Sequence, residues 1–258
     1  MSLSPLPRVP FGRIHSHVLD FDGALDRIVA LCGEGQGGYV LTPNVDHVVL
    51  AEHDDGLAEA YQKAPLSLVD GMPLVWLSRL MGTPLPQKIS GSDLVRPLAT
   101  RAQQEGLSLF LLGAKEGVAG RASAILQQEN PGLVVKGTLS PPLGFERDVH
   151  ENERVLRTVQ EARPDLLFVA LGAPKQELWL SRHMQDLAPT VGLGIGATLD
   201  FIAGEVRRAP PWMSNNGLEW LYRLLQEPAR MADRYLVRDR AILSIAWRTW
   251  QQQRARRS

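Results

Sequence analysis

Polar side chains follow three apolar runs of this sequence, at positions where they can take part in chemistry. Gly172 and Gln176 follow the run "PDLLFVA", Asp70 follows "LSLV", and Thr42 and Asn44 follow "GGYVL". An aspartate whose pKa is raised by burial can act as a general base, and amide or hydroxyl groups can orient a ligand. Two alternatives stay open: Asp70 belongs to an Asp-Gly turn, and Gln176 only occupies the first turn of a helix. The pattern predicts a polar crevice at one edge of a sheet.

A glycine-rich stretch, "GIGATLDFIAGEVRRAP", places Gly192, Gly194 and Gly196 ahead of Asp200. Such glycines let a ligand approach the backbone closely. The spacing does not match the dinucleotide fingerprint, and "LLGAKEGVAG" lacks the ending of a phosphate-binding P-loop, so NAD or ATP binding is not supported. The histidines have no metal-ligand spacing. The "DFD" at residues 20–22 has the form of a metal-dependent sugar-nucleotide motif but follows no convincing strand, so we expect no metal and no cofactor.

Apolar runs typical of buried strands alternate with stretches of helical spacing. The strand candidates are residues 37–44, 64–71, 107–114, 132–139, 164–174 and 189–197, and the helix candidates between them include 45–64, 92–106, 116–131 and 148–164. Continuous apolar strands indicate a parallel sheet with helices on both faces. The sequence therefore predicts an α/β fold, with a doubly wound, mostly parallel Rossmann-like sheet and a ligand at the carboxyl ends of the strands.

The C-terminal part of the chain differs in composition. We place an α/β core at residues 1–204, with residues 1–12 as a loose lead-in, and a helical appendage at residues 205–258. Residues 207–258 contain 11 arginines, no lysine and 4 acidic residues, a net charge of +7, whereas the whole chain has a net charge of zero. In a helix over residues 235–250, one broad apolar face contains Leu236, Ile242, Leu243, Ala246, Trp247 and Trp250.

A basic amphipathic appendage of this kind fits an anionic membrane surface. A helix that caps the domain and a nucleic-acid patch are the alternatives. Since no nucleic-acid-binding motif accompanies the appendage, we expect no nucleic-acid partner, and its apolar face makes a homo-oligomer possible in solution. The single cysteine, Cys32, rules out an internal disulfide framework, and no signal peptide or run of 18 apolar residues is present. We expect a cytoplasmic protein that does not span the membrane.

Between Thr42 and Tyr235 the sequence resembles the WecG/TagA/CpsF family of bacterial glycosyltransferases. The motifs occur in family order: "TPNVDHVV", "VDGMPLVW", "GSDL", "LFLLGAKEGVA", "LGAPKQELW", "GIGATLDFIAGEVRRAP" and "GLEWLYRLLQEPARMADRY". The ordered set, above all its last three members, is specific to the family.

The resemblance implies an inverting transferase at the inner face of the plasma membrane. It would move a HexNAc, HexNAc-uronate or hexose from a UDP-sugar to an undecaprenyl-diphosphate-linked sugar, in the synthesis of surface polysaccharide or teichoic acid. By motif, Asp70 would be the general base, and Asp200 would contact the uracil. Thr42, Asn44 and Gln176 would position the sugar and the acceptor.

Diphosphate release requires positive charge, and without a metal motif arginines are suited to supply it. Arg223, Arg230 and Arg234 are the candidates. The chain departs from the family at Lys88, where members usually have arginine, and at Phe145, where they often have tyrosine. The remaining residues assigned to substrate binding are Gly172 and Gly194. The alternative function is a binding module for sugar nucleotides or nucleic acids that does not catalyse.

Overall fold

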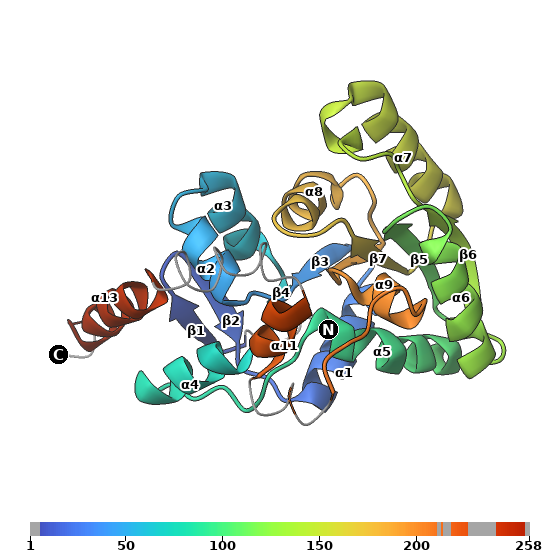
Figure 1. Ribbon diagram of the computed structural model, residues 1–258. Coiled ribbons are helices and arrows are strands. Elements are labelled where there is room, and N and C mark those ends of the chain that lie inside the picture. Colours follow the sequence, from blue (N-terminus) through green and yellow to red (C-terminus); the bar gives the residue numbers. More distant parts are fainter. Residues whose placement is uncertain (1–5, 211–212, 214–217, 227–240, 256–258) are drawn as a thin grey trace.

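The computed structural model describes residues 6–210, 213, 218–226 and 241–255, and its centre is a six-stranded sheet (Figure 1). The strands lie in the order β4 (Leu66–Ser67), β3 (Gly38–Leu41), β8 (Val191–Gly194), β7 (Leu166–Ala170), β5 (Ser108–Gly113) and β6 (Val134–Leu139). Every neighbouring pair is parallel. The predicted α/β fold with a parallel sheet is confirmed, and each strand lies inside one of the predicted apolar runs.

Alternate side chains of each strand enter two apolar clusters, one on each face of the sheet. In β7, for example, Leu167 and Val169 belong to one cluster, and Leu166 and Phe168 belong to the other. The first face is covered by α2 (Val45–Ala51), α3 (Asp55–Lys63), α7 (Val149–Ala162) and α8 (Lys175–His183). The second face is covered by α1 (Phe21–Gly33), α5 (Gly91–Glu105), α6 (Val118–Glu129) and α9 (Thr198–Ile202). Because both faces of the central strands β3, β8, β7 and β5 are buried, these strands read as nearly continuous apolar runs, whereas every second side chain of the edge strand β6 is exposed.

Residues 8–17 form a β-hairpin, so the prediction of a loose lead-in over residues 1–12 was wrong from Arg8 onward. β1 (Arg8–Phe11) pairs with β2 (Ile14–His17) in antiparallel register. Val9, Phe11 and Ile14 are each 1% exposed and join the first apolar cluster. Four-residue strands interrupted by polar side chains are too short to produce a clear alternating pattern.

The hairpin covers β4, the outermost strand on one side of the sheet. The Ser67 N–H donates to His17 Nδ1 at 3.0 Å, and the Ser67 hydroxyl donates to the backbone oxygen of His15 at 2.6 Å. These bonds satisfy polar groups that an edge strand otherwise presents to solvent. Both histidines are buried, and their rings meet edge to face with centroids 5.0 Å apart.

Two acidic stretches mark helix starts. Asp20 accepts a hydrogen bond from the Gly23 N–H at 2.9 Å and caps α1, so "DFD" is a helix start in this fold. Asp54 accepts from the Leu57 N–H at 2.9 Å and caps α3, which divides the single helix predicted at 45–64 into two.

Within the described part of the chain, no three histidine, cysteine, aspartate or glutamate side chains are close enough to hold a metal ion.

The last helix, α13 (Ala241–Ala255), packs on the hairpin and on α2 (Figure 1). Ile245 is 4% exposed within the first apolar cluster, and the Gly12 N–H donates to Thr249 Oγ1 at 3.0 Å. Arg248 forms an ion pair with Glu52 at the end of α2. The C-terminal helix is therefore joined to the core by apolar and polar contacts, while the division of the chain at residue 204 stays a prediction.

The predicted apolar face of α13 is only partly covered by the core. Ile242 and Trp250 pack against the core, whereas Leu243 is 70% exposed and Trp247 is 60% exposed. The core therefore covers one side of this broad face and leaves the other side exposed, and Leu236 lies outside the described residues. Trp247 stacks near Trp250, with ring centroids 5.0 Å apart.

The two histidines of the hairpin make stability depend on pH. Burial and the positive charges of His17 and Arg8 lower the pKa of His15 from 6.5 to about 4. Burial and the positive charge of Arg8 likewise lower the pKa of His17 from 6.5 to about 4. Between pH 6.5 and 4 the unfolded chain binds more protons, so stability rises with pH in that window.

We expect the melting temperature to fall as the pH is lowered from 7 to 5, by about 2–4 °C for each kcal/mol lost. His17→Asn keeps an acceptor for the Ser67 N–H but cannot titrate, so its melting temperature should change less over the same range. An equal change in both proteins would contradict this assignment.

Candidate active site

The carboxyl ends of all six strands meet at one edge of the sheet, and several of the predicted site residues lie along it. In strand order, Asp70 follows β4, Thr42 follows β3, Gly194 ends β8 and Gly172 follows β7. Since neighbouring strands lie about 4.8 Å apart, β4 and β6 are separated by about 24 Å. The residues therefore form a line along the edge, and the two ends of this line can have different functions.

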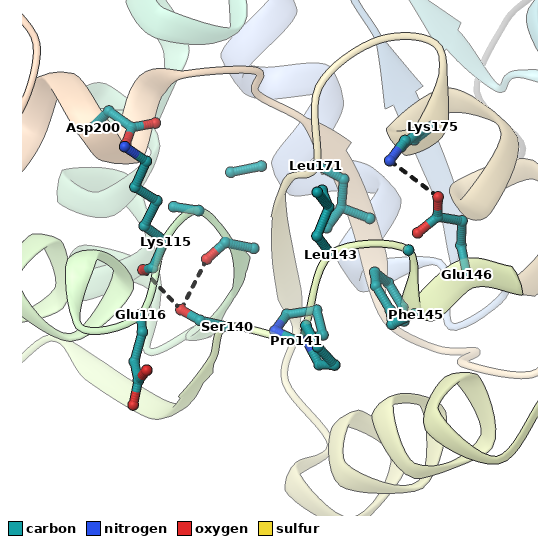
Figure 2. Close-up of a pocket in the computed structure, with 15 residues that line it drawn as sticks. Lys115, Glu116, Ser140, Pro141, Leu143, Phe145, Glu146, Leu171, Lys175 and Asp200 are labelled. Atoms are coloured by element: carbon teal, nitrogen blue, oxygen red, sulfur yellow. Dashed lines mark hydrogen bonds and ion pairs between the residues drawn. The ribbon is translucent and has the colours of Figure 1, made fainter. Parts of the chain in front are cut away.

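The β5–β6–β7 end of this edge contains a pocket of about 760 Å³ (Figure 2). Of the predicted residues, Phe145 and Asp200 line it. Its other lining residues include Lys115, Glu116, Ser140, Leu143, Glu146, Leu171 and Lys175. A pocket of this volume, with an apolar wall and a few polar groups, is typical of sites for small organic ligands.

Charged side chains lie on opposite sides of the pocket. Lys115 extends toward Asp200 on one side, and on the other Lys175 Nζ pairs with Glu146 Oε1 at 3.1 Å (Figure 2). Burial raises the pKa of Asp200, and Lys115 opposes that rise. The Ser140 hydroxyl lies 3.2 Å from the backbone oxygens of both Gly113 and Lys115, which ties the end of β6 to the end of β5.

Sequence reasoning missed Lys115, Lys175 and Ser140. Both lysines come shortly after an apolar strand, in "GAK" and in "GAPK", so their position in the sequence was a usable signal. The strand ends are close because Ala114 N–H donates to the Ala170 oxygen at 3.0 Å, and a Cβ at Gly113 would lie 2.3 Å from that oxygen. Glycine is therefore required where β5 meets β7.

The β3–β4 end of the edge holds Asp70, Thr42 and Asn44. Asp70 is half-buried, and its N–H donates to the Pro43 oxygen at 2.8 Å, which joins the two strand ends. Gly71 has φ +121° and begins α4 (Met72–Leu80), so Asp70 also occupies the turn that its sequence indicates. The side chain of Asn44 accepts from the His47 N–H at 3.3 Å and caps α2. The catalytic and binding roles of these residues stay predictions.

A buried polar pair joins α2 and α3. Tyr61 Oη is 2.7 Å from His47 Nδ1, and both side chains are buried. Burial, and then the negative charges of Glu177 and Asp70, hold the pKa of Tyr61 well above its usual value. The charges of both carboxyl groups therefore raise the pKa of the same hydroxyl.

Gln176 is 4% exposed, and its amide bonds to protein on two sides. Its Nε2 donates to Glu177 Oε1 at 2.8 Å, and its Oε1 accepts from the Gly196 N–H at 3.0 Å. The helix-start interpretation also holds, because Gln176 is in the first turn of α8 and its N–H donates to the oxygen of Gly172, which has φ +75°. Gln176 thus joins the end of β7 to the turn after β8.

Lys88 lies beside the first turn of α5, where the Asp93 carboxylate accepts hydrogen bonds from several side chains. Lys88 Nζ is 2.9 Å from Asp93 Oδ2, and Arg208 pairs with Asp93 Oδ1. Ser90 and Asp93 also form a capping box. Burial opposes ionisation of Asp93, but Lys88, Ser90 and Arg208 outweigh it and lower its pKa to about 2. Asp93 thereby fixes the position of Lys88.

The three predicted arginines cannot be placed in this arrangement. Arg223 belongs to α11 (Glu219–Gln226), but its side chain is outside the described set. Arg230 and Arg234 lie outside the described residues.

Comparison with known proteins identifies the family. The sequence profile of the "Glycosyl transferase WecG/TagA/CpsF family" matches residues 9–257. The chain belongs to this family. It is therefore a glycosyltransferase, and the match extends beyond residues 42–235 to include the N-terminal hairpin and α13.

Two WecG/TagA/CpsF relatives have the same name, N-acetylglucosaminyldiphosphoundecaprenol N-acetyl-beta-D-mannosaminyltransferase. The protein of Bacillus spizizenii is 29% identical over 230 residues, which cover 89% of this chain and 86% of that protein. The protein of Bacillus subtilis is 31% identical over 194 residues, which cover 75% of this chain and 73% of that protein.

No helix among the described residues has the length and apolar character needed to cross a membrane.

The contact between Gln176 and Gly194 can be tested by adding one methyl group. A Cβ at Gly194 would lie 3.0 Å from Gln176 Nε2, so Gly194→Ala should displace the amide and lower the free energy of unfolding by about 1–3 kcal/mol. Gly120→Ala is the matched control because no atom lies within 4 Å of its Cβ position in α6, and it should stabilise by about 0.5–1 kcal/mol. Urea denaturation measures both values. Stabilisation by Gly194→Ala equal to that of the control would contradict the contact.

Proposed function

We propose that this glycosyltransferase transfers a sugar from a UDP-sugar to an undecaprenyl-diphosphate-linked sugar, with inversion at the anomeric carbon. The observation that carries the proposal is the division of one sheet edge into a ligand pocket at β5–β6–β7 and a half-buried aspartate at β4. The names of the two Bacillus relatives support the lipid-linked acceptor and make N-acetylmannosamine the first donor sugar to test.

The nucleotide occupies the pocket. Phe145 supplies an apolar ring beside the base, and Asp200 at the other wall accepts from a base N–H. Lys115 and Lys175 supply positive charge near the diphosphate. The donor then extends along the edge past Gly194 and Gln176, so that its sugar reaches Thr42 and Asp70.

The transfer is a single displacement. Asp70 takes the proton from the acceptor hydroxyl, whose oxygen attacks the anomeric carbon on the face opposite UDP. The bond between that carbon and the diphosphate oxygen breaks, and UDP leaves with the bonding electrons. Thr42 and Asn44, on the neighbouring strand end, orient the sugar. Half-burial of Asp70 favours a base that is reached by the acceptor but screened from bulk water.

The negative charge that grows on the diphosphate requires cations. Lys88 is held near the edge by Asp93, and it supplies a point charge where an arginine would supply a planar fork. The remaining cations for the diphosphate are Arg223, Arg230 and Arg234 of the C-terminal segment.

The enzyme acts as a peripheral protein at the inner face of the plasma membrane. Two observations support this proposal: α13 exposes Leu243 and Trp247, and Arg254 lies 4.2 Å from the ring centroid of Trp250. An exposed apolar and basic helix face binds anionic lipid surfaces. α13 packs on α2, whose seven residues span about 10 Å between Glu52 and Asn44. A lipid-anchored acceptor at α13 would therefore be close to the β3–β4 end of the site.

The direct test measures UDP release from UDP-ManNAc, UDP-ManNAcA, UDP-Glc and UDP-GlcNAc with a short-chain lipid-diphosphate-GlcNAc acceptor. We expect release from one donor, dependent on the acceptor and faster with anionic liposomes. Folded, full-length protein that releases UDP from none of them would favour a binding module in place of the transferase.

Asp70→Asn should lower that rate by about 100-fold or more, because general-base catalysis contributes at least that factor. Its affinity for UDP should be unchanged, because Asp70 does not line the pocket. Asp55→Asn is the matched control, since the Asp55 side chain is 94% exposed, and it should retain full activity. Near-full activity of Asp70→Asn would remove Asp70 from the mechanism.

A further inference from the structure

Glu177 is a carboxyl group with no exposed surface. Its Oε1 accepts a hydrogen bond from Gln176 Nε2, and its Oε2 has no hydrogen-bond partner among the described residues. Burying a charge without an opposite charge is costly. Burial raises the pKa of Glu177 to about 7, although the Gln176 bond opposes the rise. A group kept at such a cost beside a ligand site is a candidate for a role in that site.

The bond from Glu177 determines which way the Gln176 amide faces. An ionised carboxylate can only accept hydrogen bonds, so the amide must present its NH₂ group to Glu177. The amide oxygen is then directed to the Gly196 N–H, where it accepts at 3.0 Å. With the amide turned over, an oxygen would face the Glu177 oxygen, and the NH₂ group would face the Gly196 N–H.

The Gly196 bond in turn fixes the segment that carries Asp200. Gly196 has φ +55° and lies two residues before α9, which places Asp200 on the wall of the pocket. On the other side, Gln176 follows Lys175, which belongs to the opposite wall. Glu177, Gln176 and Gly196 therefore form one chain of contacts that sets the spacing of the two walls.

We propose that Glu177 is a positioning residue for the donor nucleotide: its carboxyl fixes the Gln176 amide, which holds the Gly196 turn and thereby places Asp200 at the pocket. The inference rests on the proposed function, because the ligand whose binding it controls is the UDP of the donor. Glu177 is buried and does not line the pocket, so its influence on the nucleotide passes through Gln176.

An exchange of the two side chains tests the proposal with little change in volume. Gln176→Glu places two acceptors face to face and should weaken UDP binding about tenfold or more at pH 8. Glu177→Gln retains a carbonyl oxygen for the Gln176 NH₂ group and should weaken UDP binding only about threefold.

The double variant, Gln176→Glu with Glu177→Gln, restores a donor opposite an acceptor. The amide introduced at position 177 can donate to one oxygen of the carboxylate introduced at position 176, while the other oxygen accepts from the Gly196 N–H. UDP should therefore bind to the double variant about tenfold more tightly than to Gln176→Glu alone.

The readout is the UDP dissociation constant from calorimetry, with thermal denaturation of each variant as a check of folding. A purely structural role for Glu177 would change melting temperatures without this rescue of UDP affinity. If the unaltered protein binds UDP and the double variant binds no more tightly than Gln176→Glu, the inference is wrong and the proposed function stands. Unaltered affinity in Gln176→Glu would also overturn it. Failure of the unaltered protein to bind UDP would overturn both.

Discussion

The hydrogen bonds between parallel strands determine where the candidate site residues that follow the strands lie. Because all six strands run in one direction, their carboxyl ends meet at a single edge, and any polar residue that follows a strand is brought to it. The strand order then sets the position along the edge: Asp70 is at the β4 end, Gly194 is near the middle, and Ser140 is at the β6 end. The distribution of chemistry is thus a consequence of sheet topology, with apolar clusters on both faces holding the sheet together.

Polar contacts between the strand ends give the edge its detailed shape. Gln176 joins the ends of β7 and β8, Ser140 joins those of β6 and β5, and Asp70 joins those of β4 and β3 through its backbone. These bonds are shielded from water to different degrees, and Gln176 with Glu177 is the most buried pair. Buried polar groups lose much stability when a partner is removed, so such bonds hold a site rigidly. Rigidity suits a transferase, since donor and acceptor must meet in one geometry.

Much of the fold was accessible from the sequence because a buried parallel strand leaves a continuous apolar run. The run "PDLLFVA" contains β7, and the helical spacing that follows Asp148 corresponds to α7. The hairpin at residues 8–17 was missed because its stability depends on contacts with Ser67, far along the chain. Which residues of the predicted apolar face of α13 are covered could not be read from the sequence: a helical pattern gives spacing, but the packed partner decides that Trp250 is covered and Trp247 is exposed.

Part of the candidate site, like part of the fold, was predictable from the sequence. The family motifs and strand ends led to Asp70, Thr42, Phe145 and Asp200, and the structure brings the last two together in one pocket. Lys115 and Lys175 were missed, since a lysine after a strand is common and only the pocket gives it meaning. The contacts of Gln176 with Glu177 and Gly196 could not be foreseen either, because they require the turn after β8 to approach α8.

In the proposed mechanism the nucleotide binds at the β5–β6–β7 end of the edge, while transfer takes place at the β3–β4 end. Hydrogen–deuterium exchange with and without saturating UDP tests this division most directly, because it reports which backbone segments the nucleotide protects. We expect slower exchange in residues 113–117, 143–147 and 198–202, which form or adjoin the pocket, and little change in residues 44–48 and 70–76. Protection confined to residues 44–48 and 70–76, with none around the pocket, would contradict it.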